Sequence, residues 1–454
     1  MVDGDDVRRC DILVVGDRVA RIESTIEDGG AEIIDASNCI VHPGFIDTHR
    51  HVWQTQLRTV ATDWSLFDYV AEMRCVHSAF YSPDDVYLGN YAGALEAVNA
   101  GITTLVDHCH IINSADHATE AVRGLTESGI RAEFCYGFWP NPTSFTPFTA
   151  VPGEAWRFDV ARALRKGPLS SDDARVRLGI APSELEGMPF ELTAQEIAFA
   201  RDLEVACLSL HVAMGAYDGG HKMVEQLHKA GLLREDMVFV HGSALTDHEL
   251  RLLADTGCGL SVTPETELQM AMGIPVASRS MQAGVHTGIG IDIVSNYSGD
   301  MFAQMRILLQ TMRSQINLEY QRRGQAPKVI TPKAMDVLRM ATIGGAKALK
   351  LGREIGTLEV GKKADIVLTS TASVHMTPAV DACGALVLNA NVGDVDTVLI
   401  DGRILKRGGR LVGVDWGSLS RRLQASSDRV VEQSRQIPLA PIRAFVNSIM
   451  PMLA

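Results

Sequence analysis

Eight short runs of β-type residues, separated by stretches with helical periodicity, constrain the fold of this 454-residue chain more than any other feature. The runs are Phe45–His51, Thr103–Asp107, Arg131–Tyr136, Val176–Ile180, Ala206–Val212, Val238–Val240, Gly259–Val262 and His286–Asp292. Helical stretches such as Asp84–Ala100 and Thr193–Leu203 lie between them. Strands that alternate with helices form parallel βα units, and eight such strands close a (β/α)8 barrel of the TIM type. We therefore predict an α/β fold with such a barrel at its centre.

Further β-type runs lie near both ends of the chain. They are Asp11–Val15, Arg18–Ile22 and Ala31–Ile34 at the start, and Ala364–Leu368 and Val395–Ile400 after the barrel region. We predict that both groups form one small β-sandwich domain. The predicted boundaries are 1–43 and 351–415 for its two halves, 44–350 for the barrel and 416–454 for a helical tail. Within that tail Leu419–Arg435 has the pattern of an exposed amphipathic helix.

The composition is typical of a globular protein that acts on small molecules. Hydrophobic residues make up 46% and charged residues 21% of the chain. The formal net charge of −13 argues against nucleic acid or an anionic membrane as a partner. The eight cysteines form no C-x-x-C pair, and the acidic N-terminus lacks the features of a signal peptide. No apolar run reaches membrane-spanning length. We therefore expect a cytoplasmic protein without a disulfide framework.

The first barrel strand carries two histidines that point the same way. Side chains alternate along a strand, so His49 and His51 share one face. Two neutral imidazoles on one face can bind a single divalent cation. In a barrel of this type the chemistry lies at the C-terminal ends of the strands, where His211, His241 and Asp292 end the fifth, sixth and eighth runs.

Several segments together resemble one known family. Pro43–His51 is similar to the first-strand signature of the amidohydrolase superfamily, in the branch of cytosine deaminase, guanine deaminase and triazine hydrolase. Gly356–Asp365 resembles the segment by which family members re-enter the β domain, and Val294–Asp300 resembles their Ser-Asn-Asn segment. The resemblance extends from about residue 8 to about residue 412. It supports the barrel and implies a homodimer.

The resemblance also implies the roles of the strand-end residues. His49, His51, His211 and Asp292 correspond to metal ligands, and Asp292 is also the expected general base. His241 corresponds to the histidine that contacts the bound water or the substrate. Binuclear relatives use a carboxylated lysine after strand four, and this chain has none there, so we expect one divalent metal. Zinc suits the mixed nitrogen and oxygen ligands, with iron or manganese as alternatives.

One position departs from the relatives. Ring deaminases of this branch carry His-x-x-Glu at the end of strand five, and this glutamate protonates the ring, whereas this chain has Met214 in its place. Methionine cannot donate a proton. Thr263–Glu267 follows the seventh run with two carboxylates, and we predict that Glu265 supplies the missing acid. Alternatively these carboxylates cap the next helix or bind a substrate amine. We assign the substrate-binding role to Glu267.

Three further residues are candidates for substrate binding. Gln54 completes a His-x-His-x-x-Gln pattern that resembles guanine deaminase, in which the glutamine reads the purine edge. Trp53 can stack on a flat ring or pack in the core. His108 and His110 share a face at the end of the second run. They could bind a second metal as a pair, or His110 could contact the substrate.

The sequence therefore predicts a mononuclear metal-dependent amidohydrolase that acts on a C–N bond other than a peptide bond. The substrate is a small cyclic or heteroaromatic molecule, and the reaction is deaminase-like. Because Met214 replaces the acid, the alternative is hydrolysis of an amide or of a halide or alkylamine leaving group, or a lyase or decarboxylase step. A non-catalytic scaffold would have lost metal ligands, and all four are present.

Overall fold

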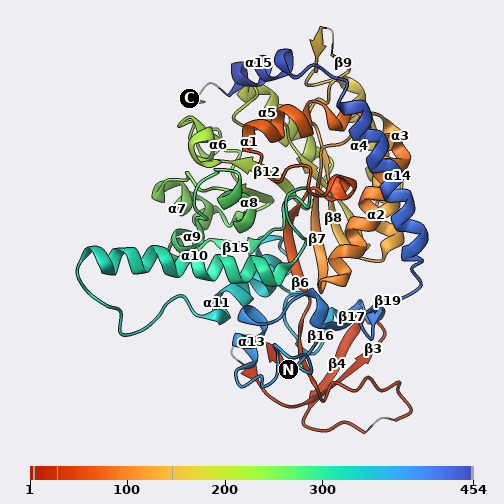
Figure 1. Cartoon of the computed structure of the whole chain (residues 1–454), viewed down its shortest axis with the longest axis vertical. Helices are drawn as coiled ribbons and strands as arrows, with labels where there is room; N and C mark the ends of the chain where they lie inside the picture. The colour runs from red at the N-terminus through yellow and green to blue at the C-terminus, as the bar shows by residue number, and fades with distance from the viewer. Residues whose placement is uncertain (4–5, 28, 146, 451–454) are drawn as a thin grey trace.

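The structure is a computed structural model that describes residues 1–3, 6–27, 29–145 and 147–450 (Figure 1). At its centre eight parallel strands form a closed barrel, with neighbours in chain order around the ring. These strands are β6 (Phe45–Arg50), β7 (Ile102–Cys109), β8 (Arg131–Gly137), β11 (Val176–Ala181), β12 (Leu208–Val212), β13 (Met237–His241), β14 (Gly259–Val262) and β15 (His286–Ile289). The predicted (β/α)8 barrel is confirmed.

Helices surround the barrel and separate its strands in sequence. They are α2 (Pro83–Asn99), α3 (Ala115–Ser128), α4 (Ala155–Lys166), α5 (Phe190–Asp202), α6 (Met223–Lys229), α7 (Asp247–Thr256), α8 (Pro264–Gln269), α9 (Ala277–Ala283), α10 (Met301–Arg322), α11 (Ala334–Arg339) and α12 (Gly345–Ala348). Local sequence sets several of their starts. Ser82 and Asp85 form a capping box at the start of α2, and Thr246 and Glu249 form another at α7.

Short turns of helix and two small strands complete this part of the chain. They are η1 (Val52–Leu57), α1 (Leu66–Asp68), η2 (Tyr69–Arg74), η3 (His77–Phe80), β9 (Ser144–Phe145), β10 (Phe148–Thr149), η4 (Gly215–Asp218) and η5 (Met340–Gly344). The first four follow β6 directly in the chain.

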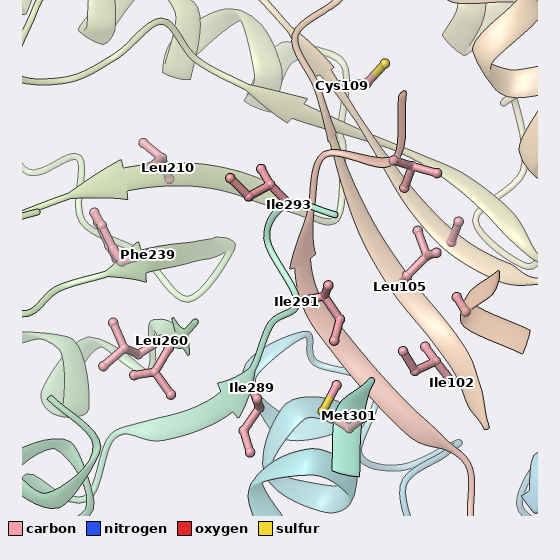
Figure 2. Close-up of a cluster of buried hydrophobic side chains, with 14 of the residues drawn as sticks. Ile102, Leu105, Cys109, Leu210, Phe239, Leu260, Ile289, Ile291, Ile293 and Met301 are labelled. Atoms are coloured by element: carbon pink, nitrogen blue, oxygen red, sulfur yellow. The ribbon is translucent and has the colours of Figure 1, made fainter. Parts of the chain in front are cut away.

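Apolar side chains from all sides of the barrel pack together in the core. Figure 2 shows Leu210, Phe239 and Leu260 on one side and Leu105 on the other, with Ile291 between them. All five are at most 1% exposed. Burial of each such side chain stabilises the fold by about 1.5–3 kcal/mol.

A second, antiparallel sheet joins the two ends of the chain. Its order is β19-β18-β17-β16-β5, comprising β5 (Cys39–Pro43), β16 (Ile366–Ser370), β17 (Val395–Ile400), β18 (Arg403–Arg407) and β19 (Arg410–Leu411). The N-terminal strand β5 pairs with β16 from the C-terminal part. The hairpin of β3 (Asp11–Val15) and β4 (Arg18–Glu23) shares an apolar cluster with this sheet. The predicted composite β domain is thus present, and its residue boundaries stay a prediction.

One predicted strand of this domain is absent. Residues 31–34 have no regular secondary structure, and Ile33 is 67% exposed. A β-type run forms a strand only where a sheet edge offers it a partner, and this run has none among the described residues. The remaining short elements are β1 (Val2–Asp3), β2 (Asp6–Val7), α13 (Ala382–Leu388) and η6 (Val392–Asp394).

The tail forms two helices that run along the barrel. Helix α14 (Trp416–Ser434) lies beside α2, where the amphipathic pattern predicted a helix, and α15 (Leu439–Ile449) follows it within the segment predicted as a helical tail (Figure 1). Helix α15 packs on η2 through Ile442 and Val446. Across the described ranges, no helix has the length and apolar character needed to cross a membrane.

Candidate metal centre and active-site cavity

A cavity of about 360 Å³ opens at the C-terminal ends of the barrel strands. Its walls include His51, His211, His241 and Asp292, which follow or end four different strands. This is the position at which barrels of this type carry their active sites.

Four of the predicted residues converge at one side of this cavity. Nε2 of His49 and Nε2 of His51 each lie 3.4 Å from Oδ1 of Asp292. Nε2 of His211 lies 3.2 Å from Nε2 of His49. Donor atoms so spaced can share one cation at metal–ligand distances of about 2.0–2.2 Å. His49, His51 and Asp292 therefore form one compact donor group, and His211 lies against it through His49.

The ring nitrogens that face away from this point are held by other groups. Nδ1 of His51 lies 2.8 Å from the carbonyl oxygen of His108, and Nδ1 of His211 lies 3.0 Å from Oε2 of Glu184. Such contacts keep the proton on Nδ1 and leave Nε2 free as a ligand. Burial lowers the pKa of His49 and of His51 well below the usual value, so both rings are neutral. The donor set therefore fits a divalent cation.

His108 is a neighbour of this cluster. Its ring stacks on that of His211 with centroids 4.3 Å apart, and it forms a second possible donor group with His49 and His211. His110 is not part of that group.

The backbone is strained at the cavity. Ala213, His241 and Asp292 have positive φ angles of 51°, 72° and 66°, although none is a glycine. Such conformations cost of the order of 1–3 kcal/mol each and concentrate at functional sites. They turn the chain at the ends of β12 and β13 and after β15.

His241 faces the cavity, and Glu267 lies behind it. Nδ1 of His241 is 3.0 Å from Oγ1 of Thr263 and 3.7 Å from Oε1 of Glu267. Glu267 is fully buried and accepts a hydrogen bond from the Thr263 backbone. Glu267 is therefore not placed to contact substrate, because its carboxylate caps the first turn of α8.

The expected position of Glu265 needs a correction. Its Oε2 accepts a hydrogen bond of 2.8 Å from the Gln304 side chain of α10, and it does not line the cavity. Pro264 begins α8, and the helical turn directs the next side chain outward. Glu265 therefore does not face the place where an acid is needed.

The residues expected to bind substrate after β6 and β7 also lie behind the wall. Trp53 is fully buried and donates from Nε1 to Nδ1 of His110, while the Gln54 amide donates to the Tyr69 hydroxyl. His110 stacks on His51 with ring centroids 4.1 Å apart. The η1 turn directs Trp53 and Gln54 into the core, and His110 lies against Trp53, so these three side chains support cavity residues and do not line the cavity.

Other charged groups line the cavity instead. Glu184 and Glu186 follow β11, and Arg74 ends η2. Oε1 of Glu186 accepts a hydrogen bond of 2.6 Å from the backbone N–H of Ala213, next to Met214. Burial raises the pKa of Glu186 well above its usual value, and the carboxylates of Asp218 and Glu184 add to this. Burial therefore favours the protonated form of Glu186, beside the position at which relatives carry their glutamate.

The rest of the wall is mostly apolar. Its aliphatic, aromatic and methionine members are Leu66, Tyr69, Val70, Trp139, Met214, Tyr217, Met270, Met272, Ile293, Ile449 and Met450, and the others are Gly187, Gly219, His221 and Thr266. Such a cavity suits a small ring that carries a few polar groups.

Comparison with known proteins agrees with this geometry. The model of the amidohydrolase family matches residues 40–405. The chain belongs to the amidohydrolase family. The superfamily predicted from Pro43–His51 is thereby confirmed.

Two proteins of known activity that are similar to this amidohydrolase are deaminases. The 5'-deoxyadenosine deaminase of Methanothermobacter thermautotrophicus is 30% identical over 420 residues, which cover 90% of this chain and 92% of that protein. The 5-methylthioadenosine/S-adenosylhomocysteine deaminase of Desulforudis audaxviator is 28% identical over 411 residues, covering 88% and 89%. The predicted class, a hydrolase acting on carbon–nitrogen bonds other than peptide bonds, is confirmed.

Solved structures share the fold of this amidohydrolase. An adenosine deaminase from Xanthomonas campestris with bound zinc has a TM-score of 0.81 at 23% identity, covering 94% of each chain. A triazine hydrolase from Arthrobacter aurescens has a TM-score of 0.80 at 21% identity, covering 92% of this chain and 94% of that one.

The sequence contained a signal for the acids that were missed in this amidohydrolase. Ser183-Glu184-Leu185-Glu186 follows the fourth β-type run directly, which is a strand-end position like the others. No comparable signal marked Arg74, because it lies in a short helical turn far from any strand end.

Proposed function

We propose that this amidohydrolase is a metal-dependent deaminase of a small aminated heterocycle. The observation that carries this proposal is the donor group of His49, His51 and Asp292, with His211 against His49, beside a cavity that Glu186 also lines. The deaminase relatives support the same reaction class.

In this proposal the four converging residues hold one divalent cation. Zinc fits their nitrogen and oxygen atoms, with iron or manganese as alternatives. When bound, the cation acts as a Lewis acid and lowers the pKa of water at the site.

The chain's own residues then handle protons and charge. The Asp292 carboxylate accepts the proton of the attacking water, and His241 stabilises the charge that develops opposite it. Thr263 fixes the orientation of the His241 ring through Nδ1.

Glu186 replaces the missing acid of strand five. It lies beside Met214, and its raised pKa favours the protonated carboxyl, which can give its proton to a ring nitrogen of the substrate. Glu184 is less suited to this task. Burial alone would raise its pKa, but His211 and Arg74 hold it below the usual value, so it is ionised.

An ammonia assay tests the proposal. We would measure ammonia release by metal-quantified protein from aminated purines, pyrimidines, triazines and pterins, together with 5'-deoxyadenosine. We expect metal-dependent release, and we expect Glu186→Gln to lower kcat by about 10²- to 10⁴-fold. In the double variant Glu186→Gln/Met214→Glu, a carboxyl at the relatives' position should restore part of the rate. Full activity of Glu186→Gln would remove Glu186 from the mechanism.

A second candidate follows from Met214, which lines the cavity at the place of the family's acid. Departure of a halide or alkylamine, hydrolysis of an amide, or a lyase or decarboxylase step needs no ring protonation by that residue. Release of halide, amine or carbon dioxide without ammonia would favour it.

We also propose that the protein is a cytoplasmic homodimer. The resemblance to paired relatives supports the dimer, and the eight unpaired cysteines of the described chain fit a reducing compartment. Sedimentation analysis tests the dimer.

A further inference from the structure

Arg74 is a buried cation with one unpartnered edge. Its residue is 3% exposed and lines the cavity. Nη1 lies 3.6 Å from Oε1 of Glu184, and the guanidinium stacks over the Trp139 ring at 4.7 Å from the centroid. Among the residues that the structure describes, Nε and Nη2 have no hydrogen-bond partner. These two atoms form one side of the guanidinium fork.

Trp139 adds a third free donor to this wall. Its Nε1 is also buried and has no partner in the described ranges, although the indole lines the cavity. Buried donors of this kind are rare in native proteins because an unmade hydrogen bond costs about 1–3 kcal/mol, and more for a charged group. Burial accordingly lowers the pKa of Arg74, against the opposing effects of Tyr69 and Glu184. Two residues that line the cavity thus hold three buried donors without a partner, which a ligand group that reaches them would satisfy.

The geometry of these donors selects one chemical class. The Nε and Nη2 edge of a guanidinium presents two parallel N–H groups whose spacing matches the two oxygens of a carboxylate. A ligand group facing three donors needs acceptors only, which an ionised carboxylate provides.

The nearby acids leave this edge free. Glu184 lies at the Nη1 side and also binds Nδ1 of His211, while Glu186 accepts from the backbone N–H of Ala213. The Tyr69 hydroxyl, on the same turn, accepts its hydrogen bond from Gln54. No described anion therefore competes for Nε and Nη2.

The element that carries Arg74 is held firmly in place. The six residues of η2 form a π-helical turn, a conformation frequent at functional sites. Arg443 of α15 bonds to Asp68 and Glu72 at 2.8 Å each, and Ile442 packs beneath. Arg74 is thus preorganised.

We propose that the substrate is an aminated ring that carries a carboxylate, which Arg74 binds through Nε and Nη2 and Trp139 through Nε1. The apolar wall holds the ring between this site and the histidine cluster. The inference rests on the proposed deamination and deepens it by naming the substrate class.

A binding experiment without turnover tests the carboxylate site. Benzoate and its neutral isostere benzamide would be titrated into the metal-loaded protein by calorimetry, with tryptophan fluorescence as a second signal. We expect benzoate to bind about 10- to 100-fold more tightly than benzamide, as for charge-assisted hydrogen bonds. Arg74→Gln should abolish this preference and leave benzamide binding unchanged. Trp139→Phe, which removes only Nε1, should weaken benzoate binding a few-fold.

Two control variants make the result specific. Arg74→Lys keeps the charge but not the fork, and should retain only part of the preference. Arg157→Gln changes another buried arginine that does not line the cavity, and should leave benzoate binding unchanged. Circular dichroism melts show whether each variant is folded. Equal affinity for the two probes in the wild type would overturn the proposal. Benzoate bound as tightly by folded Arg74→Gln would also overturn it, because the ion would then occupy another part of the site.

A matched substrate pair separates this proposal from the deaminase proposal. Ammonia release would be compared for pterin and pterin-6-carboxylate. Both proposals are supported if pterin-6-carboxylate has the higher kcat/KM and Arg74→Gln removes this advantage. The carboxylate site is overturned if the wild type deaminates pterin as fast as pterin-6-carboxylate. Arg74-dependent benzoate binding with no ammonia from any compound supports the site and contradicts the deaminase.

Discussion

Glu265 shows how one carboxyl can be unusual without being catalytic. Burial raises its pKa to about 7, with a further contribution from Asp300, yet its partner is Gln304 on α10. A carboxyl whose folded-state pKa is raised stabilises the fold most below its unfolded pKa of about 4.5. This contribution is lost as the pH rises through about 7.

We therefore predict two results for Glu265→Gln. Activity should stay within about two-fold of the wild type, because the residue does not face the cavity. Between pH 4 and pH 8 the wild type should lose roughly 3 kcal/mol more unfolding free energy than the variant, since only the wild type must release this proton. Urea unfolding at both pH values measures the difference. Parallel pH profiles would contradict the assigned pKa.

The amount of metal bound per chain distinguishes the predicted ligands from the neighbouring His108. His51→Ala should reduce bound metal from about one per chain by at least ten-fold, because it removes a ligand beside Asp292. His108→Ala is the matched control: His108 stacks on His211 but belongs to the other possible donor group, and the variant should keep its metal. Elemental analysis after dialysis reads out both. Loss of metal from His108→Ala but not from His51→Ala would instead place the ion at His49, His108 and His211.

At the scale of elements, the tail helix α15 positions one wall of the cavity. Ile442 and Val446 are at most 1% exposed and pack with Ala71 and Cys75 of the η2 region. Ile449, the last residue of α15, lines the cavity itself. The tail thus links residues far apart in sequence at the site.

Loss of this packing should affect substrate binding more than chemistry. We predict that Ile442→Ala costs about 2–5 kcal/mol of local stability and raises KM several-fold with little change in kcat, because η2 loosens around Arg74. Arg443→Ala, which removes only half-exposed ion pairs, should cost at most about 1 kcal/mol. Steady-state kinetics and hydrogen exchange of residues 66–80 measure both. A fall in kcat alone for Ile442→Ala would place the tail in the chemical step.

For the whole molecule, a buried ionic network joins the barrel to the β domain. Arg131, at the start of β8, donates to the carboxylates of Asp365 and Asp401, and Asp365 also accepts from the Asp401 backbone. Arg131 and Asp365 are buried, so these charges depend on one another.

Removal of one partner should be costly. We predict that Asp365→Ala lowers the unfolding free energy by about 3–5 kcal/mol, because it leaves the Arg131 charge uncompensated. Asp17→Ala removes the more exposed ion pair with Lys363 and should cost at most about 1 kcal/mol. Chemical unfolding of the two variants gives the comparison. A similar small loss in both would show that the network does not couple the two parts.

Much of the site could be predicted because barrel topology is regular. His49, His51, His211, His241 and Asp292 lie at or just beyond strand ends, and a closed parallel barrel brings those ends to one rim. Residues beyond the strands were predicted less well. The direction of a loop side chain depends on a partner distant in sequence, as Glu265 depends on Gln304 and Gln54 on Tyr69.

The sequence by itself determined the barrel, the composite β domain, the family and the strand-end cluster, because strand alternation and βα repetition are local properties that impose one topology. Only the tertiary structure decided which carboxyl stands beside Met214 and which cation faces the cavity. Glu186, which follows β11, accepts a hydrogen bond from Ala213, which follows the neighbouring strand β12. Arg74 lies on η2, which packs against α15 near the other end of the chain. Such contacts depend on packing between segments remote in sequence, which no local pattern encodes.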